Sequence, residues 1–230
     1  MLTKNYGINF SFVITVKNEM TELKRLIDVL KNYIHKDDEL IIFQDNVNPV
    51  VNDIIHPDIT KTFHYIQTID IGIPVRHILF PLNNNFTNFK NKFISECNRE
   101  YIFHFDADEF PNESLIKSIR VLISQNKQIE MYWVPRINTL LENSKMDYYI
   151  NLWSWKVNNK GWINFPDYQQ RIWKNLKQIS FTGNVHERLI GFSTYTFLPP
   201  EEKFAYYHPK TLSKQIKQNL FYSQIQEEKK

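Results

Sequence analysis

The first 135 residues alternate short apolar segments with amphipathic ones, and this alternation limits the possible folds more than any other feature. The apolar segments are short and rich in Val, Ile and Phe, as is typical of buried strands. They lie at residues 10–16, 39–43, 75–80, 101–105 and 130–135. An alternation of strands and helices predicts an α/β fold, with a mainly parallel sheet flanked by helices.

The segments between these strands have the periodicity of helices. In the first of them, Leu23, Leu26, Ile27 and Leu30 recur at intervals of three and four, which places them on one helical face. The predicted helices cover residues 21–33, 61–69, 86–98 and 111–124. Asn112 has a side chain suited to capping the amino terminus of the last one.

The pattern changes after residue 135, so we expect two halves of a single domain, residues 1–135 and 136–230. Residues 148–173 are crowded with Trp, Tyr and Phe. Further strands are expected at 169–173 and 204–208, and a closing helix at 212–225.

Composition excludes several classes of protein. The chain has only five glycines, which argues against a glycine-rich phosphate-binding loop. Its net charge of +3 comes from scattered residues, so we expect no nucleic-acid partner. No apolar stretch reaches the roughly 18 residues of a membrane span. Cys97 is the single cysteine, which rules out an internal disulfide and fits a reducing compartment, so a cytoplasmic location is expected.

Carboxylates follow three of the predicted strands. Asp106, Asp108 and Glu109 come directly after the strand at 101–105, while Asp45 and Glu19 follow two others. Parallel α/β sheets bind ligands at the carboxyl ends of their strands. Carboxylate oxygens suit Mg²⁺ or Mn²⁺, and such an ion neutralises a leaving diphosphate. A solvated acidic turn at the start of a helix is the alternative interpretation.

The segment from Asp106 to Asp108 resembles the DxD motif of GT-A fold glycosyltransferases, especially the inverting family 2 enzymes. Residues 12–19 are similar to the opening strand of that family with its Asn-Glu ending, although Lys17 replaces the usual tyrosine. Asp45 matches the aspartate of the second strand, and residues 90–91 match a basic-Asn pair on a helix.

This resemblance implies a Rossmann-like GT-A fold with a C-terminal, acceptor-side extension. It also implies that Asp106 contacts the ribose side of a nucleotide and that Asp108 binds the metal. The expected nucleotide-sugar-binding residues are Thr15, Lys17, Glu19, Asp45, Lys90, Asn91, Asp106 and Arg171. The expected metal ligands, for Mn²⁺ or Mg²⁺, are Asp106, Asp108, His208 and His186.

The second half resembles a family 2 subgroup that includes enzymes adding sugars to the lipopolysaccharide core. The similar segments are residues 167–174 and 183–187. An inverting transferase needs a general base for the acceptor hydroxyl. Glu187 is the first candidate for this base, and Asp167 is the second. The tryptophans Trp153, Trp155, Trp162 and Trp173 are candidates for an acceptor platform or for core packing.

The sequence therefore predicts a metal-dependent glycosyltransferase that moves a sugar from a nucleotide-sugar, a UDP-sugar in our interpretation, to an acceptor hydroxyl with inversion. The acceptor is expected to be a glycan, a lipid-linked molecule or a protein. A non-catalytic nucleotide-sugar or glycan-binding module remains open as an alternative. A sugar nucleotidyltransferase and a phosphatase of the haloacid dehalogenase type fit less well, because each requires a different motif context.

Overall fold

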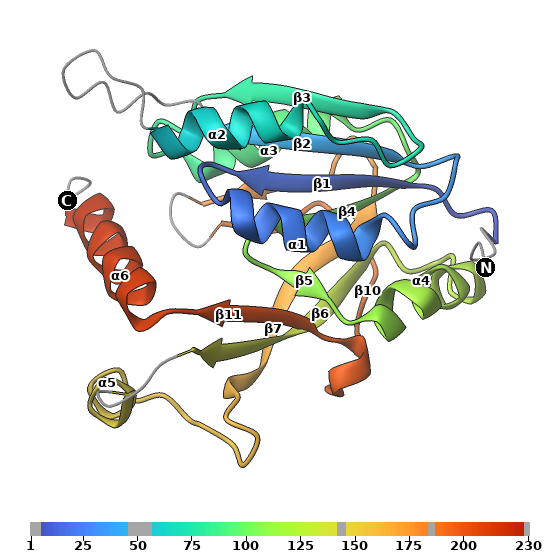
Figure 1. The fold of residues 1–230 in the computed structure, drawn as a ribbon. Coiled ribbons are helices and arrows are strands. Elements are labelled where there is room, and N and C mark those ends of the chain that lie inside the picture. The colour runs from blue at the N-terminus through green and yellow to red at the C-terminus, as the bar shows by residue number, and fades with distance from the viewer. Residues whose placement is uncertain (1–5, 46–56, 142–145, 184–186, 228–230) are drawn as a thin grey trace.

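The computed structural model describes residues 6–45, 57–141, 146–183 and 187–227 (Figure 1). Its central feature is one large sheet with the strand order β3-β2-β1-β4-β7-β6-β11-β5. Its first half is parallel and consists of β1 (Phe10–Val16), β2 (Glu39–Asp45), β3 (Val75–Phe80) and β4 (Tyr101–Asp106). The α/β fold with a mainly parallel sheet, which the sequence predicted, is confirmed.

The second half of the chain extends the same sheet. Besides β5 (Phe110–Pro111) of the first half, it contains β6 (Met131–Leu140), which crosses residue 135, and then β7 (Ile163–Lys174), β10 (Tyr195–Phe197) and β11 (Tyr206–Lys210). Strand β7 is antiparallel to both of its neighbours, β4 and β6, whereas β11 is parallel to β6. Because β6 crosses residue 135, the two halves of the chain share a continuous hydrogen-bonded ladder.

Helices cover both faces of this sheet (Figure 1). The helices of the described residues are α1 (Met20–Leu30), α2 (Pro57–Ile66), α3 (Phe86–Glu96), α4 (Glu113–Gln125), α5 (Met146–Leu152), a 3₁₀ turn at Glu202–Phe204 and α6 (Leu212–Glu227). None of the described helices is long and apolar enough to cross a membrane. Helices α5 and α6 stand at the edge where β1 and β11 end, away from the other helices (Figure 1).

Two apolar cores lie on opposite faces of the sheet, as the alternation of strand side chains requires. Phe12 and Ile14 of β1 belong to the core shared with α1 and α4, whereas Val13 between them belongs to the other core. That second core packs α3, through Phe89 and Phe93, against the sheet. The two cores fix the sheet between its helices and hold the strand ends in register.

The elements differ from the sequence-based expectation mainly in the second half. Helix α5 and the small sheet of β8 (Ser180–Thr182) and β9 (Arg188–Ile190) were not predicted. The strand expected at 169–173 is the last part of the longer β7. Helix α2 begins at Pro57, four residues before the expected start, because proline is well suited to the first helical turn.

Candidate active site

A cavity of about 1440 Å³ opens at the carboxyl edge of the parallel strands. Residues from β1, β2, β4, β6, β7, β11 and α6 line it, so both halves of the chain contribute. It gathers most of the site residues expected from the sequence: Thr15, Lys17, Glu19, Asp45, Lys90, Asp106, Asp108, Asp167, Arg171, Glu187 and His208. His186 lies outside the described residues.

Asp106 ends β4 and is held by protein groups through both carboxylate oxygens. The Thr15 hydroxyl donates to Oδ1 at 2.7 Å, and Arg171 Nη2 donates to Oδ2 at 2.6 Å. Burial alone would raise the pKa of Asp106, but the charge of Arg171 outweighs it and holds this pKa well below its usual range. Asp106 is therefore an anion whose orientation is fixed, and neither oxygen is left without a donor.

His104 completes a closed ring of hydrogen bonds behind Asp106. Arg171 Nη1 lies 2.9 Å from His104 Nδ1, and an arginine can only donate, so Nδ1 is the acceptor. His104 Nε2 then carries the proton and donates to Thr15 Oγ1 at 3.2 Å. Complete burial lowers the pKa of His104 well below its usual value, which keeps the ring neutral. The sequence suggested only a structural role for His104; the structure shows that it orients Thr15 and Arg171.

Glu109 holds the turn after β4 in place from the interior of the protein. It is fully buried, and its Oε1 accepts hydrogen bonds from Arg171 at 2.6 Å and from Arg136 at 2.9 Å. Its backbone N–H donates to the carbonyl of Asp106 at 2.9 Å, which closes the turn. The three acids of this turn thus differ: Asp106 and Asp108 line the cavity, whereas Glu109 is a buried counterion for two arginines.

Asp108 faces His208 across the cavity. Asp108 Oδ2 lies 3.5 Å from His208 Nε2, and the two side chains are 17% and 7% exposed. Burial would raise the pKa of Asp108, yet the neighbouring His208 and the lysines Lys210 and Lys214 lower it. Burial also lowers the pKa of His208, which favours a neutral imidazole.

The hydrogen bonds of Asn138 define which nitrogen of His208 is free. Its Nδ2 donates to the carboxylate of Asp167 at 2.8 Å, so its Oδ1 faces His208 Nδ1 at 2.7 Å and accepts the imidazole proton. A neutral His208 therefore presents an Nε2 lone pair to the cavity, next to the Asp108 carboxylate. An imidazole nitrogen oriented by an amide partner, beside a carboxylate, is a donor pair that suits a divalent cation.

The described residues contain no group of three His, Cys, Asp or Glu side chains arranged as a metal site. Asp108 and His208 form a pair, while both oxygens of Asp106 are engaged by Thr15 and Arg171. The residues thus fit a cation that takes two ligands from the protein and the others from a bound phosphate or water. Asp106 was expected to be a ligand as well, but the structure places it in the hydrogen-bond ring.

The two candidate bases have different surroundings. Asp167 Oδ2 accepts from Arg136 at 2.7 Å and from Asn138. Burial would raise the pKa of Asp167, but the Arg136 guanidinium and the Asn138 amide lower it. Glu187 Oε1 contacts the ammonium of Lys90 on α3, and its side chain is 11% exposed. Glu187 thus pairs with a lysine ammonium, while Asp167 is held by the arginine guanidinium and the asparagine amide together.

The residues at the ends of β1 and β2 form the other end of the cavity. Lys17 Nζ pairs with Asp45 Oδ2 at 2.9 Å, and the backbone N–H of Leu82 donates to Asp45 Oδ1 at 3.0 Å. Glu19 Oε2 accepts from the backbone N–H groups of Lys17, at 2.9 Å, and of Asn18. Glu19 therefore shapes the turn after β1, and Asp45 lies at the base of the cavity beside it.

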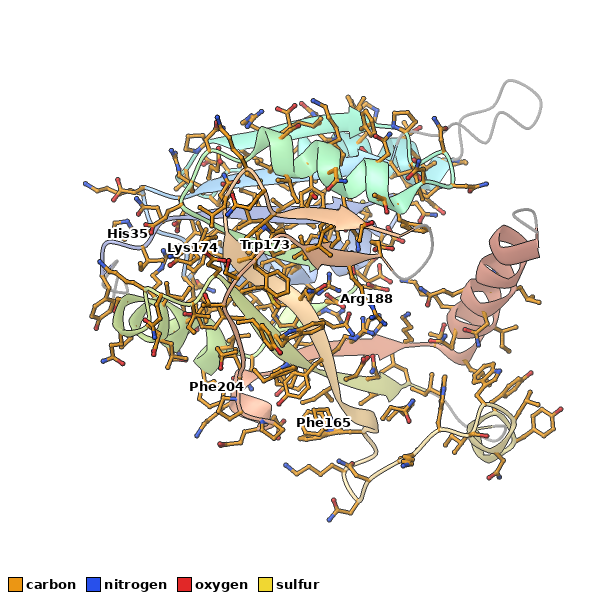
Figure 2. The ribbon with its side chains drawn as sticks, turned by 180° about the vertical axis from the view of Figure 1, so that it is seen from behind. His35, Phe165, Trp173, Lys174, Arg188 and Phe204 are labelled. Carbon is orange, nitrogen blue, oxygen red and sulfur yellow. The ribbon has the colours of Figure 1, made fainter. Side chains whose placement is uncertain are left out.

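Asn91 and the tryptophans take positions that the sequence did not specify. The Asn91 amide bonds both backbone groups of Phe181 in β8, at 2.7 and 3.0 Å, so it supports the wall instead of lining the cavity. Trp155 lines the cavity, and so does Trp133, which had not been considered. Trp173 is completely buried in the interior (Figure 2), so the idea that it forms part of an acceptor platform was wrong.

Comparisons with known proteins identify the family and the fold of the chain. The sequence model described as Glycosyl transferase family 2 matches residues 11–197. Among solved structures, the chain is similar to residues 1–349 of TarS from S. aureus, with a TM-score of 0.54 and 12% identity over 88% of this chain and 60% of that chain. The same TarS fragment in complex with UDP-GlcNAc gives a TM-score of 0.55 and 11% identity, over 88% and 59% of the two chains.

A comparison with curated proteins found no match. The chain spans about 60% of the length of the TarS fragment, and the low identity means that this similarity supports the fold alone. The family match is broader, since it covers most of the chain and includes both DxD aspartates and both candidate bases. The chain therefore belongs to glycosyl transferase family 2, and it has the GT-A α/β fold of a nucleotide-sugar glycosyltransferase.

Proposed function

We propose that the protein transfers a sugar from a UDP-sugar to an acceptor hydroxyl, with a divalent cation and with inversion at the anomeric carbon. The observation that carries this proposal is the Asp108–His208 pair, which faces the cavity 3.5 Å apart and stands beside the fixed anion Asp106. With a divalent cation bound to this pair, a charged phosphate group would be held next to the reacting sugar.

The nucleoside would bind at the end of the cavity formed by β1 and β2. Asp45 and the Thr15 end of β1 are positioned for hydrogen bonds to the base, and Asp106 for the ribose. Uridine is our choice of base because a structure of the similar TarS fragment is a complex with UDP-GlcNAc and another is a complex with UDP. Lys17 forms an ion pair with Asp45, so a nucleoside bound to Asp45 would also lie within reach of the Lys17 ammonium group.

Asp108 and His208 would hold Mn²⁺ or Mg²⁺. A bound ion of this kind supplies positive charge to the diphosphate and so makes it a better leaving group. Lys210 adds a further cation. It is buried in β11, and its ammonium donates to Gln218 Oε1 of α6. Burial lowers the pKa of Lys210, which means that an anion in the cavity would be favourable to it.

The reaction would be a single displacement. The acceptor oxygen forms a bond to the anomeric carbon, the bond from that carbon to the diphosphate oxygen breaks, and the diphosphate leaves with the electron pair. Glu187 would take the acceptor proton, because Asp167 is fully engaged by Arg136 and Asn138 and is a weak base. Lys90 contacts Glu187 and would hold its carboxylate in place at the wall of the cavity.

The test is calorimetric titration with UDP in the presence and absence of Mn²⁺, on the native protein and on Asp108→Ala. We expect binding of UDP that requires both the metal and Asp108. Metal-independent UDP binding would disprove the metal-dependent part of the proposal. Absence of binding to the native protein would disprove the choice of uridine, and a titration with GDP would then be the next step. The configuration of the product, read by NMR, tests inversion.

A further inference from the structure

Lys214 contacts the carboxylate of Asp108, which is one of the two proposed metal ligands. Its Nζ is 3.2 Å from Asp108 Oδ2, the same oxygen that faces His208 Nε2 at 3.5 Å. Asp108 is only 17% exposed, so its charge is poorly screened by water. Lys214 stands in the first turn of α6 and so reaches Asp108 from a different element than His208 does.

A second carboxylate is within reach of the same lysine. Lys214 Nζ lies 3.6 Å from Glu22 Oε1 of α1, and the two side chains are 36% and 35% exposed. The ammonium group is therefore within ion-pair distance of both carboxylates at once. Because the lysine side chain is long and partly exposed, it can shift toward Glu22 while it keeps one of its two ion pairs.

We propose that Lys214 is a built-in counterion of Asp108 that competes with the divalent cation, so that it sets the metal affinity of the site. A cation with two charges cannot share one carboxylate oxygen with an ammonium group without strong repulsion. Metal binding would displace Lys214 toward Glu22, and Glu22 would thus act as the receiving position. The inference rests on the proposed metal site, which the same experiment tests separately.

The experiment measures binding of Mn²⁺ alone, without nucleotide, by the loss of the free Mn²⁺ signal in electron paramagnetic resonance. Omitting the nucleotide removes any contact of Lys214 with phosphate. Lys214→Met keeps an unbranched side chain only one atom shorter and removes its charge, and we expect it to bind Mn²⁺ about tenfold more tightly than the native protein. Lys217→Met is the matched control: it makes the same charge change on the next turn of α6, and we expect an affinity within about twofold of native.

We expect Glu22→Gln to lower the affinity for Mn²⁺, which is the opposite of the effect expected for Lys214→Met. Without the carboxylate of Glu22, the lysine has no second position and stays on Asp108, so Mn²⁺ should bind more weakly than to the native protein. In the Lys214→Met background the same change should have little effect, because Glu22 acts through Lys214 in this account. A merely structural role for Lys214 would not produce opposite signs in the two single variants, nor this loss of the Glu22 effect.

The outcomes separate the two proposals. Equal or weaker Mn²⁺ binding by Lys214→Met, with clear binding by the native protein, would overturn the counterion role and leave the metal site intact. If Lys214→Met binds Mn²⁺ and the native protein does not, the counterion role is supported, because Lys214 then blocks the metal site completely. If neither protein binds Mn²⁺, with or without UDP, the metal site and the counterion role both fail.

Discussion

At the scale of single residues, the site depends on side chains that the reactants would not touch. His104 accepts from Arg171 and donates to Thr15, and both of these hold Asp106. The sequence placed His104 in the strand before the DxD motif, but nothing in its spacing showed which groups it would meet. The partners come from residues 89 and 67 positions away along the chain, and only the packed sheet brings them together.

Replacing His104 with Phe should separate packing from positioning. The new ring can keep the stacking contact with Phe93, whose ring centroid lies 4.9 Å from that of His104. It leaves Arg171 with an unpaired buried N–H, which costs about 1–3 kcal/mol of folding free energy. We expect this loss in urea unfolding, together with weaker UDP binding by calorimetry. Unchanged affinity for UDP would show that the ring does not position Asp106, and Phe93→Leu serves as the packing control.

Glu187→Gln should bind UDP as the native protein does and turn over about 10²–10⁴ times more slowly, because a general base contributes a factor of that size. The rate of UDP release from a UDP-sugar measures turnover, with water as the acceptor if no other is known. The matched variant is Asp167→Asn, which we expect to lower stability more than turnover, since Asp167 anchors Arg136 and Asn138. Full activity of Glu187→Gln would assign the base elsewhere.

At the scale of elements, the sequence predicted the strands and helices that are long enough to show a clear apolar periodicity. Strands β1 to β4 and helices α1, α3 and α4 were expected within a few residues, because each repeats apolar side chains at the interval of its own geometry. Helix α5 and strands β8, β9 and β10 were missed. Each is at most seven residues long, and β9 for example has a single buried residue between two exposed ones, too short a run to establish a period.

The caps of two helices give a prediction at this scale. Asn112 accepts from Ser114 N at 2.9 Å at the start of α4, and Asn85 accepts from Asn88 N at 2.9 Å at the start of α3. Either Asn→Ala change should cost about 0.5–2 kcal/mol in urea unfolding. Asn112→Ala should cost more, since Asn112 also donates to the Tyr207 hydroxyl of β11 at 3.0 Å. Equal losses would mean that the bond to β11 adds nothing measurable.

At the scale of the whole molecule, the location of the site was predictable and its pairings were not. A parallel sheet places its ligands at the carboxyl ends of its strands, so Asp45, Asp106 and Asp108 could be assigned to one edge from the sequence alone. Asp106 and Asp108 have ionisable partners on β7, β11 and α6, whereas Asp45 pairs with Lys17 just after β1. Contacts such as that between Lys90 and Glu187 join residues 97 positions apart, and no local pattern reports them.

Cys97 offers a probe of the whole fold. Its thiol is buried against the second core, and burial raises its pKa, so almost no reactive thiolate is present at neutral pH. We expect iodoacetamide to label it only as fast as the protein unfolds, with the labelling rate rising through the urea transition. Rapid labelling of the native protein would mean that this core opens locally. The Cys97→Ala protein provides the unlabelled baseline.

The reversed direction of β7 has a consequence for how such a chain can diversify. Because β7 runs against β4 and β6, it carries Asp167 and Arg171 to the cavity, where Asp167 lies opposite Arg136 of β6 and Arg171 forms an ion pair with Asp106 of β4. Strand β6 ends at Leu140 and β7 begins at Ile163, and Trp155 between them lines the cavity. Lengthening such a connection costs only logarithmically in closure entropy. On the function that we propose, changes in the length of this one connection could accommodate other acceptors without moving the strands that carry Asp106 and Arg171.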